Sequence, residues 1–374
     1  MSSSAIFQPA VRTRITSLLQ CKYPLLLPGM SWISTPRLVA AVSNAGGCGI
    51  LATGPLSPDE TRESIREIRS LTDQPFGIGA TLLMPGATEN AQVALEEQVP
   101  LINVSLGKPD WIAQEAHAYG GKVLATVTNA KHATIALEAG ADALMVTGHE
   151  AAAHGGDVTS LVLIAAMAQQ FPNVPLVAAG GFANGRGLAA ALALGADAVA
   201  MGSRLAVTQD SPLAESVKEA VSDHAVTEAD TLYGKNFDGI PARVLKTPMA
   251  SRRMKNRPNP LSVLARAFQA AGDMKVPLWK ILPGMLVEYD KIYALAQFGA
   301  ATQDIQAATV DGSLDKGVQF IGQSCGLIQD IPTVHELIQQ IIAEARQTSL
   351  QNVARFEEPG DASIINSSTE ELAS

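Results

Sequence analysis

The sequence has few of the features that mark secreted, metal-binding or disulfide-linked proteins. Its 374 residues include only three cysteines, Cys21, Cys48 and Cys325, which lie far apart in the chain. Cysteines at such spacing form neither a disulfide framework nor the close pairs of a zinc site. We therefore expect reduced thiols in a cytoplasmic protein.

Long apolar runs and positive charge are also scarce. No stretch approaches the ~20 apolar residues of a membrane span, and residues 1–20 lack the apolar core of a signal peptide. The net charge of -9 disfavours nucleic acid, whose phosphates attract basic surfaces. Neither G-x-G-x-x-G nor G-x-x-x-x-G-K-[ST] occurs, which argues against a Rossmann site and a P-loop. We expect neither nucleic acid nor membrane among the partners.

Hydrophobic residues make up 47% of the chain and charged residues 17%, which supports a large core. Short apolar runs alternate with longer amphipathic ones, the pattern of strand–helix units. The expected strands are Pro24–Leu27, Gly49–Ala52, Phe76–Ala80, Leu101–Val104, Val123–Val127, Ala143–Val146, Leu176–Ala179 and Ala198–Met201. The expected helices are Thr35–Asn44, Pro58–Ser70, Asn90–Gln98, Pro109–Ala118, Ala130–Ala139, Ser160–Gln170, Gly185–Ala193 and Val207–Val221. Eight such units predict an α/β fold, a TIM (β/α)8 barrel.

The pattern changes near Asp223, which predicts an inserted subdomain. We expect residues 1–222 and 316–356 to form the barrel, 223–315 a helical cap over its mouth, and 357–374 a disordered tail. The cap is expected to contain helices Leu261–Ala271 and Val287–Phe298, and a helix at Val334–Arg346 to return to the barrel. The basic run Lys246–Arg257 is interpreted as a solvated loop, or alternatively as a lid that attracts an anion.

The most informative stretch is Thr147–Asp157, which follows the sixth expected strand. Small residues surround two histidines, His149 and His154, in this segment. Small residues let a flat ligand approach the backbone, and histidine can exchange protons near neutral pH. The alternative is a flexible connector with solvated histidines. Its position at the end of a barrel strand favours the functional interpretation.

Two glycine-containing loops follow the seventh and eighth expected strands. They are Ala178–Phe182, with Gly180 and Gly181, and Met201–Arg204. Barrel enzymes often bind phosphate with these two loops, so the pair favours a phosphate site over simple turns.

Further small and polar residues follow other strands and would surround the same mouth. Gly29-Met30-Ser31, Thr81 and Thr126 could together line one face of a flat cofactor, although Met30 taken alone is better explained by core packing. The two central histidines complete no metal triad, so we expect no catalytic metal.

These features together resemble the nitronate monooxygenase group, once called 2-nitropropane dioxygenases. The resemblance spans Tyr23 to Arg346. It rests on Val42-Ser-Asn-Ala-Gly-Gly47, Gln74-Pro-Phe-Gly77, Gly148-His-Glu-Ala-Ala-Ala-His154, Ala179-Gly-Gly-Phe182, Leu194-Gly-Ala-Asp197, Met201-Gly-Ser-Arg204, Ile240-Pro-Ala-Arg243 and Gly322-Gln323. The group consists of FMN-binding barrels and includes NADH:quinone reductases and flavin-dependent enoyl-acyl-carrier-protein reductases.

The resemblance implies FMN at the barrel mouth and His154 as the active-site histidine. It implies a phosphate site formed by Ala179, Gly180, Gly181, Met201, Gly202 and Ser203. It implies a flavin ring near Gly29, Met30, Ser31, Thr81, Thr126 and Ala152.

The chain departs from the family's usual pattern near the expected ring. Leu27-Pro28-Gly29 precedes Met30 where the family usually has Gln-Gly, Gly79 replaces an asparagine, and Ala153 replaces the second glycine of Gly-Gly-His. Thr126 replaces a longer polar residue.

The resemblance therefore implies an FMN-dependent oxidoreductase that oxidises an alkyl nitronate with molecular oxygen. One alternative is an NAD(P)H-dependent reductase of a quinone or an enoyl thioester. Another is a barrel that binds FMN without turnover. The partner would be a small-molecule substrate; the sequence leaves the substrate, the electron donor and the oligomeric state open, including a homodimer.

Overall fold

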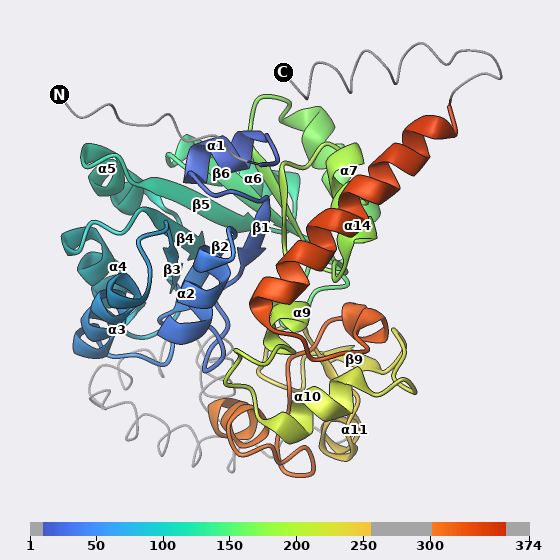
Figure 1. The fold of residues 1–374 in the computed structure, drawn as a ribbon. Coiled ribbons are helices and arrows are strands. Elements are labelled where there is room, and N and C mark those ends of the chain that lie inside the picture. The colour runs from blue at the N-terminus through green and yellow to red at the C-terminus, as the bar shows by residue number, and fades with distance from the viewer. Residues whose placement is uncertain (1–9, 256–300, 357–374) are drawn as a thin grey trace.

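In the computed structural model, residues 10–255 and 301–356 are described, and within them eight parallel strands close into a barrel (Figure 1). Each strand pairs with the next, and β8 pairs with β1. The strands are β1 Leu25–Leu27, β2 Cys48–Ala52, β3 Gly77–Thr81, β4 Leu101–Ser105, β5 Lys122–Val127, β6 Ala143–Thr147, β7 Leu176–Ala179 and β8 Ala198–Ala200. This arrangement confirms the predicted TIM barrel.

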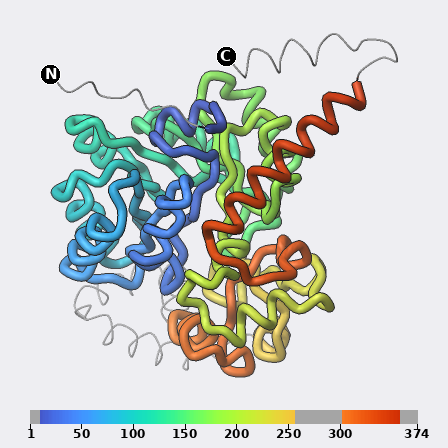
Figure 2. The backbone as a smooth tube through the Cα atoms, in the orientation of Figure 1, coloured from blue at the N-terminus to red at the C-terminus, as the bar shows by residue number. Residues whose placement is uncertain are grey.

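Helices follow the strands and surround the barrel (Figure 2). They are α2 Pro36–Asn44, α3 Pro58–Leu71, α4 Ala87–Glu96, α5 Asp110–Ala118, α6 Ala130–Glu138, α7 Ser160–Gln170, α8 Gly185–Ala193, α9 Gly202–Ala206 and α10 Glu215–Ser222. The helix predicted over Val207–Val221 is present only from Glu215 onward, as α10, and α9 lies before it, over residues that were expected to form a loop. None of the described helices is long and apolar enough to cross a bilayer.

The strands are apolar throughout because both of their faces are buried. Side chains alternate across a strand, so Leu25 and Leu27 pack toward the helices while Leu26 joins a second cluster inside the barrel. Leu124 and Met145 belong to that inner cluster. Burial on both faces explains why the strands appear in the sequence as continuous apolar runs.

A helix that the sequence analysis did not predict, α1 (Arg14–Leu19), lies at the N-terminal end of the barrel. Ile15 and Leu19 pack with the inner cluster. The Arg14 guanidinium donates to both carboxylate oxygens of Asp197, at 2.8 and 2.7 Å. These contacts attach α1 to the segment just before β8.

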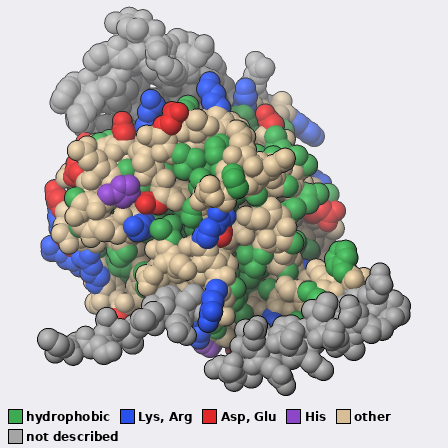
Figure 3. All heavy atoms as spheres, turned by 90° about the horizontal axis from the view of Figure 1, so that it is seen from above, with side chains coloured by type: hydrophobic (Ala, Val, Ile, Leu, Met, Phe, Trp, Pro, Cys, Tyr) green, Lys and Arg blue, Asp and Glu red, His purple; other side chains and the backbone are tan. Residues whose placement is uncertain are grey.

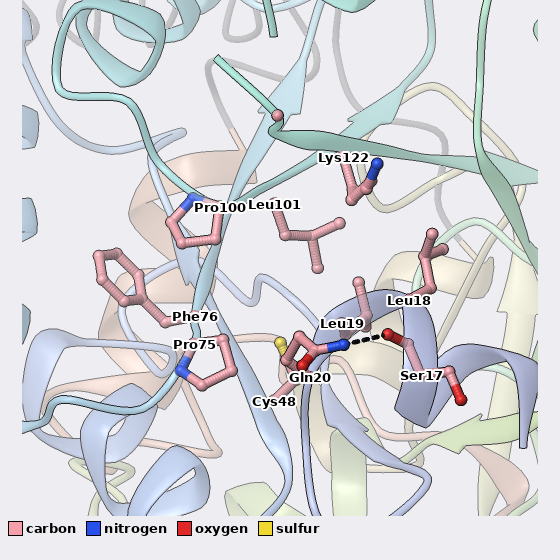
Figure 4. Close-up of a pocket in the computed structure, with 11 residues that line it drawn as sticks. Ser17, Leu18, Leu19, Gln20, Cys48, Pro75, Phe76, Pro100, Leu101 and Lys122 are labelled. Atoms are coloured by element: carbon pink, nitrogen blue, oxygen red, sulfur yellow. Dashed lines mark hydrogen bonds between the residues drawn. The ribbon is translucent and has the colours of Figure 1, made fainter. Parts of the chain in front are cut away.

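A cavity of about 400 Å³ lies between α1 and the starts of β2 to β5 (Figure 4). Cys48, Phe76 and Leu101 line it, and Gln20 donates a hydrogen bond to the Ser17 carbonyl at its edge. From the α1 side, positive and negative side chains are interspersed with hydrophobic ones on the surface (Figure 3). The cavity lies at the end of the barrel opposite the predicted mouth.

The three cysteines are free and buried. Burial raises the pKa of the Cys21 thiol to about 12, which keeps this thiol neutral at pH 7.

After α10 the chain forms an antiparallel hairpin of β9 (Thr231–Gly234) and β10 (Ala242–Leu245), followed by α11 (Pro248–Lys255). Phe237 and Val244 form a small separate core with Ala250 and Val318. This part lies at the end of the barrel opposite α1 (Figure 1). The expectation of a purely helical segment is therefore wrong over residues 231–245.

The remaining domain predictions fall partly outside the described residues. The helices expected at Leu261–Ala271 and Val287–Phe298 lie there, as does the tail at 357–374. The boundaries at residues 223 and 316 stay predictions.

The return helix α14 runs from Val334 to Ala354, eight residues longer than predicted, and packs along α8. Thr333 and Glu336 form a capping box at its start. At Gly185, an added Cβ would lie 2.4 Å from both Ala345 N and Ile341 O, so only glycine permits this approach of α8 to α14.

We therefore expect Gly185→Ala to lower the free energy of unfolding by about 1–3 kcal/mol, because the new methyl group meets the α14 backbone. Urea denaturation measures this change. The matched control is Gly187→Ala in the same helix, whose Cβ would come no nearer than 3.3 Å, to the Phe182 ring, with Asn184 Oδ1 at 3.5 Å. Alanine favours the helix, so the control should be neutral or gain up to about 1 kcal/mol. Equal effects in both variants would contradict the close-approach argument.

Candidate active site

The C-terminal ends of all eight strands meet at one mouth, where active sites of this fold lie. On the β1–β3 side of this mouth, the surface is formed by glycine backbone rather than by side chains, and we call this surface the floor. An added Cβ at Gly79 would lie 3.4 Å from Leu51 O and 3.9 Å from Gly29 Cα. Gly29 and Gly79 are therefore neighbours, and neither carries a side chain that would occupy the space above them.

Polar side chains form a network next to these glycines. Asn103 is 8% exposed, and its amide donates to Leu124 O and Thr126 Oγ1, both at 3.0 Å. Thr81 Oγ1 and Ser105 Oγ lie 3.0 Å apart. Thr81 and Thr126 belong to the predicted ring site, whereas Asn103 and Ser105 are additions that the structure makes to it. The sequence does contain a signal for them. Asn103 is a polar residue within the expected apolar strand over 101–104, and Ser105 directly follows that strand.

Asn103 lies next to Gly79, the position where the resembled family usually has an asparagine. Gly79 and Asn103 pair in register on β3 and β4, so their Cα–Cβ directions fall on the same face of the sheet. The mouth thus has an amide side chain one strand away from the position where the family usually has its asparagine.

The loop after β7 presents free backbone donors. Gly180 and Gly181 have φ of +96° and +85°, a conformation that glycine adopts without strain. Their N–H groups donate to no acceptor within the described residues. Two adjacent unpaired N–H groups form a concavity that suits an anion.

The loops after β1 and β8 lie together beside these donors. Met30 Sδ lies 3.3 Å from where a Cβ would stand on Gly202, the first residue of α9. Ser203 Oγ accepts a hydrogen bond from Gly322 N at 2.9 Å and keeps its own proton to donate. The structure thus brings together Met30, Gly202 and Ser203, which the sequence analysis assigned to one cofactor. Ser31 instead lies beside Gly54, after β2.

The loop after β6 is held by Glu150, which the sequence analysis did not single out. Its carboxylate accepts from Ser160 N at 2.8 Å at the start of α7 and lies 2.9 Å from Ser160 Oγ. Ser160 Oγ also lies 2.7 Å from Gly180 O. Glu150 O accepts from Gln323 N, and an added Cβ on Gly322 would stand 3.0 Å from Ala152 N. Glu150 therefore connects the loops after β6 and β7 with residues Gly322 and Gln323, which precede α14.

The two central histidines have different environments. His149 Nδ1 donates to Gly156 O at 2.9 Å, and its ring meets the Tyr233 ring edge-on at 4.6 Å. His154 Nε2 bonds to Asp238 Oδ2 at 2.7 Å, and its side chain is 24% exposed. His154 Nδ1 has no hydrogen-bond partner among the described residues, so His154 keeps a ring nitrogen for a ligand.

The β9–β10 hairpin docks on the loop that carries these histidines. Ala153 and Arg243 exchange two backbone hydrogen bonds, at 3.1 and 2.9 Å. The Arg243 guanidinium donates to His149 O through Nε and Nη2 and to Thr231 Oγ1 through Nη1. Burial lowers the pKa of Arg243, yet a guanidinium stays charged at neutral pH. Ala153 is held at φ +54°, which explains why glycine is usual at this position.

The described part of the basic run is largely paired. Lys246 lies 3.5 Å from Asp230, Arg252 donates to Asp315 O at 2.8 Å, and Arg253 pairs with Asp304. These contacts favour a structural role over the anion-attracting lid.

Arg243→Met should release the histidine loop, because it leaves the buried His149 carbonyl without its donors. An unsatisfied buried acceptor costs about 1–3 kcal/mol. We expect faster hydrogen exchange at the Ala153 amide and lower stability of the protein. Arg252→Met is the control, since Arg252 binds a carbonyl in an exposed hydrogen bond. Unchanged protection of Ala153 in Arg243→Met would show that the guanidinium does not hold the loop.

Comparisons with known proteins agree with this geometry. The family model described as nitronate monooxygenase matches residues 12–344. The (3aS,4S,5R,7aS)-5-hydroxy-7a-methyl-1-oxo-octahydro-1H-indene-4-carboxyl-CoA dehydrogenase of Rhodococcus jostii (strain RHA1) is 34% identical, covering 90% of this chain and 96% of its own. The nitronate monooxygenase of Pseudomonas aeruginosa is 28% identical, covering 89% and 99%. The solved structure of FabK from Thermotoga maritima is 35% identical, with a TM-score of 0.76, covering 92% and 100%. The chain therefore belongs to the nitronate monooxygenase family, a family of flavin-dependent oxidoreductases.

Proposed function

We propose that the protein is an FMN-dependent oxidoreductase that oxidises an alkyl nitronate with molecular oxygen. The observation that carries the proposal is the pairing, at one mouth, of two N–H groups, at Gly180 and Gly181, with His154 Nδ1, none of which has a hydrogen-bond partner in residues 10–255 and 301–356. The first suits a cofactor phosphate, and the second suits proton transfer to or from a substrate.

The residues of this chain fit FMN. Glycines at 180 and 181 leave the donors accessible, and the first turn of α9 adds further N–H groups near Ser203. We assign the phosphate to Ala179, Gly180, Gly181, Met201, Gly202 and Ser203. We place the ring near Gly29, Met30, Ser31, Thr81, Thr126 and Ala152. FMN, when bound, supplies the electron transfer, and the protein supplies position and electrostatics.

The protein's own part in the reaction is to hold the nitronate and, when the substrate arrives as the neutral nitroalkane, to accept the α-proton whose loss gives the nitronate. His154 would accept or share a proton through the ring nitrogen that Asp238 leaves free. The Asn103–Thr126 network would offer polar groups below the ring. Backbone floor at Gly29 and Gly79 leaves room for a planar group.

A second candidate is oxidation of a coenzyme A thioester. It is favoured by the 34% identity to a protein named as a carboxyl-CoA dehydrogenase, against 28% to the nitronate monooxygenase of Pseudomonas aeruginosa. The same histidine and the same flavin position would serve either substrate. NAD(P)H as the electron donor for a quinone or an enoyl thioester is a third outcome of the assay below.

The cofactor proposal is tested by releasing the ligand and identifying it by mass, with FMN expected. Gly181→Asp should then abolish binding, because the new carboxylate repels the phosphate and an added Cβ there would stand 3.3 Å from Glu150 Cβ. The matched control is Gly120→Asp. It has nearly the same φ (+87°) at the far end of the barrel, with open space around its Cβ. The control should keep its flavin. Released FAD, or full FMN content in Gly181→Asp at unchanged circular dichroism, would refute the assignment.

The reaction is tested by anaerobic reduction of the bound flavin with a nitronate, an acyl-CoA or NAD(P)H. We expect the nitronate to reduce it, and His154→Ala to slow reduction by the neutral nitroalkane, whose proton a base must remove, by ~100- to 10,000-fold per bound flavin. His149→Ala is expected to do much less, because His149 bonds within its own loop. Reduction by the acyl-CoA or NAD(P)H alone selects the corresponding alternative, and reduction by none leaves a binding protein. A larger effect of His149→Ala would mean that His154 is not the base.

A further inference from the structure

Asp238 is a fully buried carboxylate in the connection between β9 and β10, residues 235–241. It accepts two hydrogen bonds within the described residues. Ile240 N donates to Oδ1 at 3.2 Å, and His154 Nε2 donates to Oδ2 at 2.7 Å. Asp238 lies 84 positions after His154 in the chain. No sequence motif connected the two residues.

The geometry fixes which nitrogen of His154 carries the proton. An ionised carboxylate only accepts hydrogen bonds, so the short contact requires a proton on Nε2. Neutral imidazole carries one proton, and therefore Nδ1 is left as the acceptor. We infer that Asp238 is the positioning residue for His154 and makes Nδ1 the nitrogen that takes the α-proton of a neutral substrate, such as the nitroalkane from which the nitronate forms. This inference rests on the proposed function, in which His154 handles that proton.

The surroundings of the pair support this assignment. The Phe320 ring lies 6.2 Å from the His154 ring, and the Ala153–Arg243 bridge holds the preceding residue. The Arg243 guanidinium donates its hydrogen bonds to His149 O and Thr231 Oγ1. Among the described residues, the hydrogen bonds to the Asp238 side chain come from His154 and from the backbone amide of Ile240. The Asp238 side chain is 0% exposed, and a buried carboxylate charge without a partner is energetically costly. Within the described residues, His154 is the one side chain that pairs with it.

It follows that the hairpin outside the barrel contributes to the reaction. His154 stands on a barrel loop, whereas Asp238 stands on the hairpin that docks over it. The base is complete only when the two parts are in contact.

Asp238→Asn is the informative substitution, because it keeps the size of the side chain. The Ile240 N–H faces Oδ1, so the amide oxygen must occupy that position and the NH₂ group must face His154. His154 Nε2 then becomes the acceptor, Nδ1 is protonated, and the base is blocked. In serine proteases the same change on the triad aspartate lowers kcat by about 10,000-fold.

The first measurement is the ¹⁵N spectrum of histidine-labelled holoenzyme. Wild type should show His154 protonated at Nε2, and Asp238→Asn should show the opposite tautomer. A wild-type His154 protonated at Nδ1 would overturn the inference without any variant. The control is Asp142→Asn, which removes the carboxylate from the His117–Asp142 pair (2.9 Å) at the other end of the barrel. It should leave the His154 signals unchanged.

The second measurement is the rate of flavin reduction by whichever neutral donor reduces the wild type. Asp238→Asn should lower kcat by at least ~100-fold, with KM and flavin content nearly unchanged. A purely structural role would instead reduce flavin content or stability at an unchanged rate per flavin, and it would refute the inference. Asp142→Asn should match wild type. If no donor reduces wild type, the proposed function fails, while the spectrum still decides the tautomer.

Discussion

Closure of the sheet by hydrogen bonds between β1 and β8 is the constraint on which the rest of the structure depends. Closure removes both sheet edges and brings eight strand ends to one rim. Residues from distant parts of the chain, such as Gly29, Thr126 and Gly202, can only meet there. The small inner side chains of β8, Ala198 and Ala200, belong to the cluster that fills the barrel interior. The site therefore lies on a packed floor rather than at the opening of a pore.

The loops on that rim are not held by the barrel alone. Glu150 connects the loops after β6 and β7, and Arg243 holds the backbone around His149 from outside the barrel. Side-chain contacts to backbone carbonyls give these loops fixed positions without regular structure. Fixing the loop in this way places strain on the backbone of Ala153. Its φ lies in the left-handed region, and two backbone hydrogen bonds to Arg243 hold it there.

The barrel could be predicted because its strands are buried on both faces and its helices carry one apolar face, and both patterns are local. Helix α1 could not, since six residues have little helical preference alone and depend on contacts such as that of Arg14 with Asp197, 183 positions away. The hairpin was missed because its four-residue strands are separated by seven residues rather than a two-residue turn. The sequence pointed to His154 and the glycine loops, since each directly follows a strand. It could not reveal Asp238, and it included Arg243 only within the Ile240–Arg243 motif, because the roles of both residues arise from tertiary contact.

The docking of the hairpin on the histidine loop has a consequence for the order in which the molecule is made. A chain synthesised from its N-terminus completes all eight barrel strands by residue 200, before residues 231–245 leave the ribosome. The strands can pair at that stage, but Ala153 has no bridge partner and His154 no carboxylate. The loop that carries His154 can therefore make its final contacts only after the hairpin has been synthesised, so the strands of the barrel precede the candidate site in the order of synthesis.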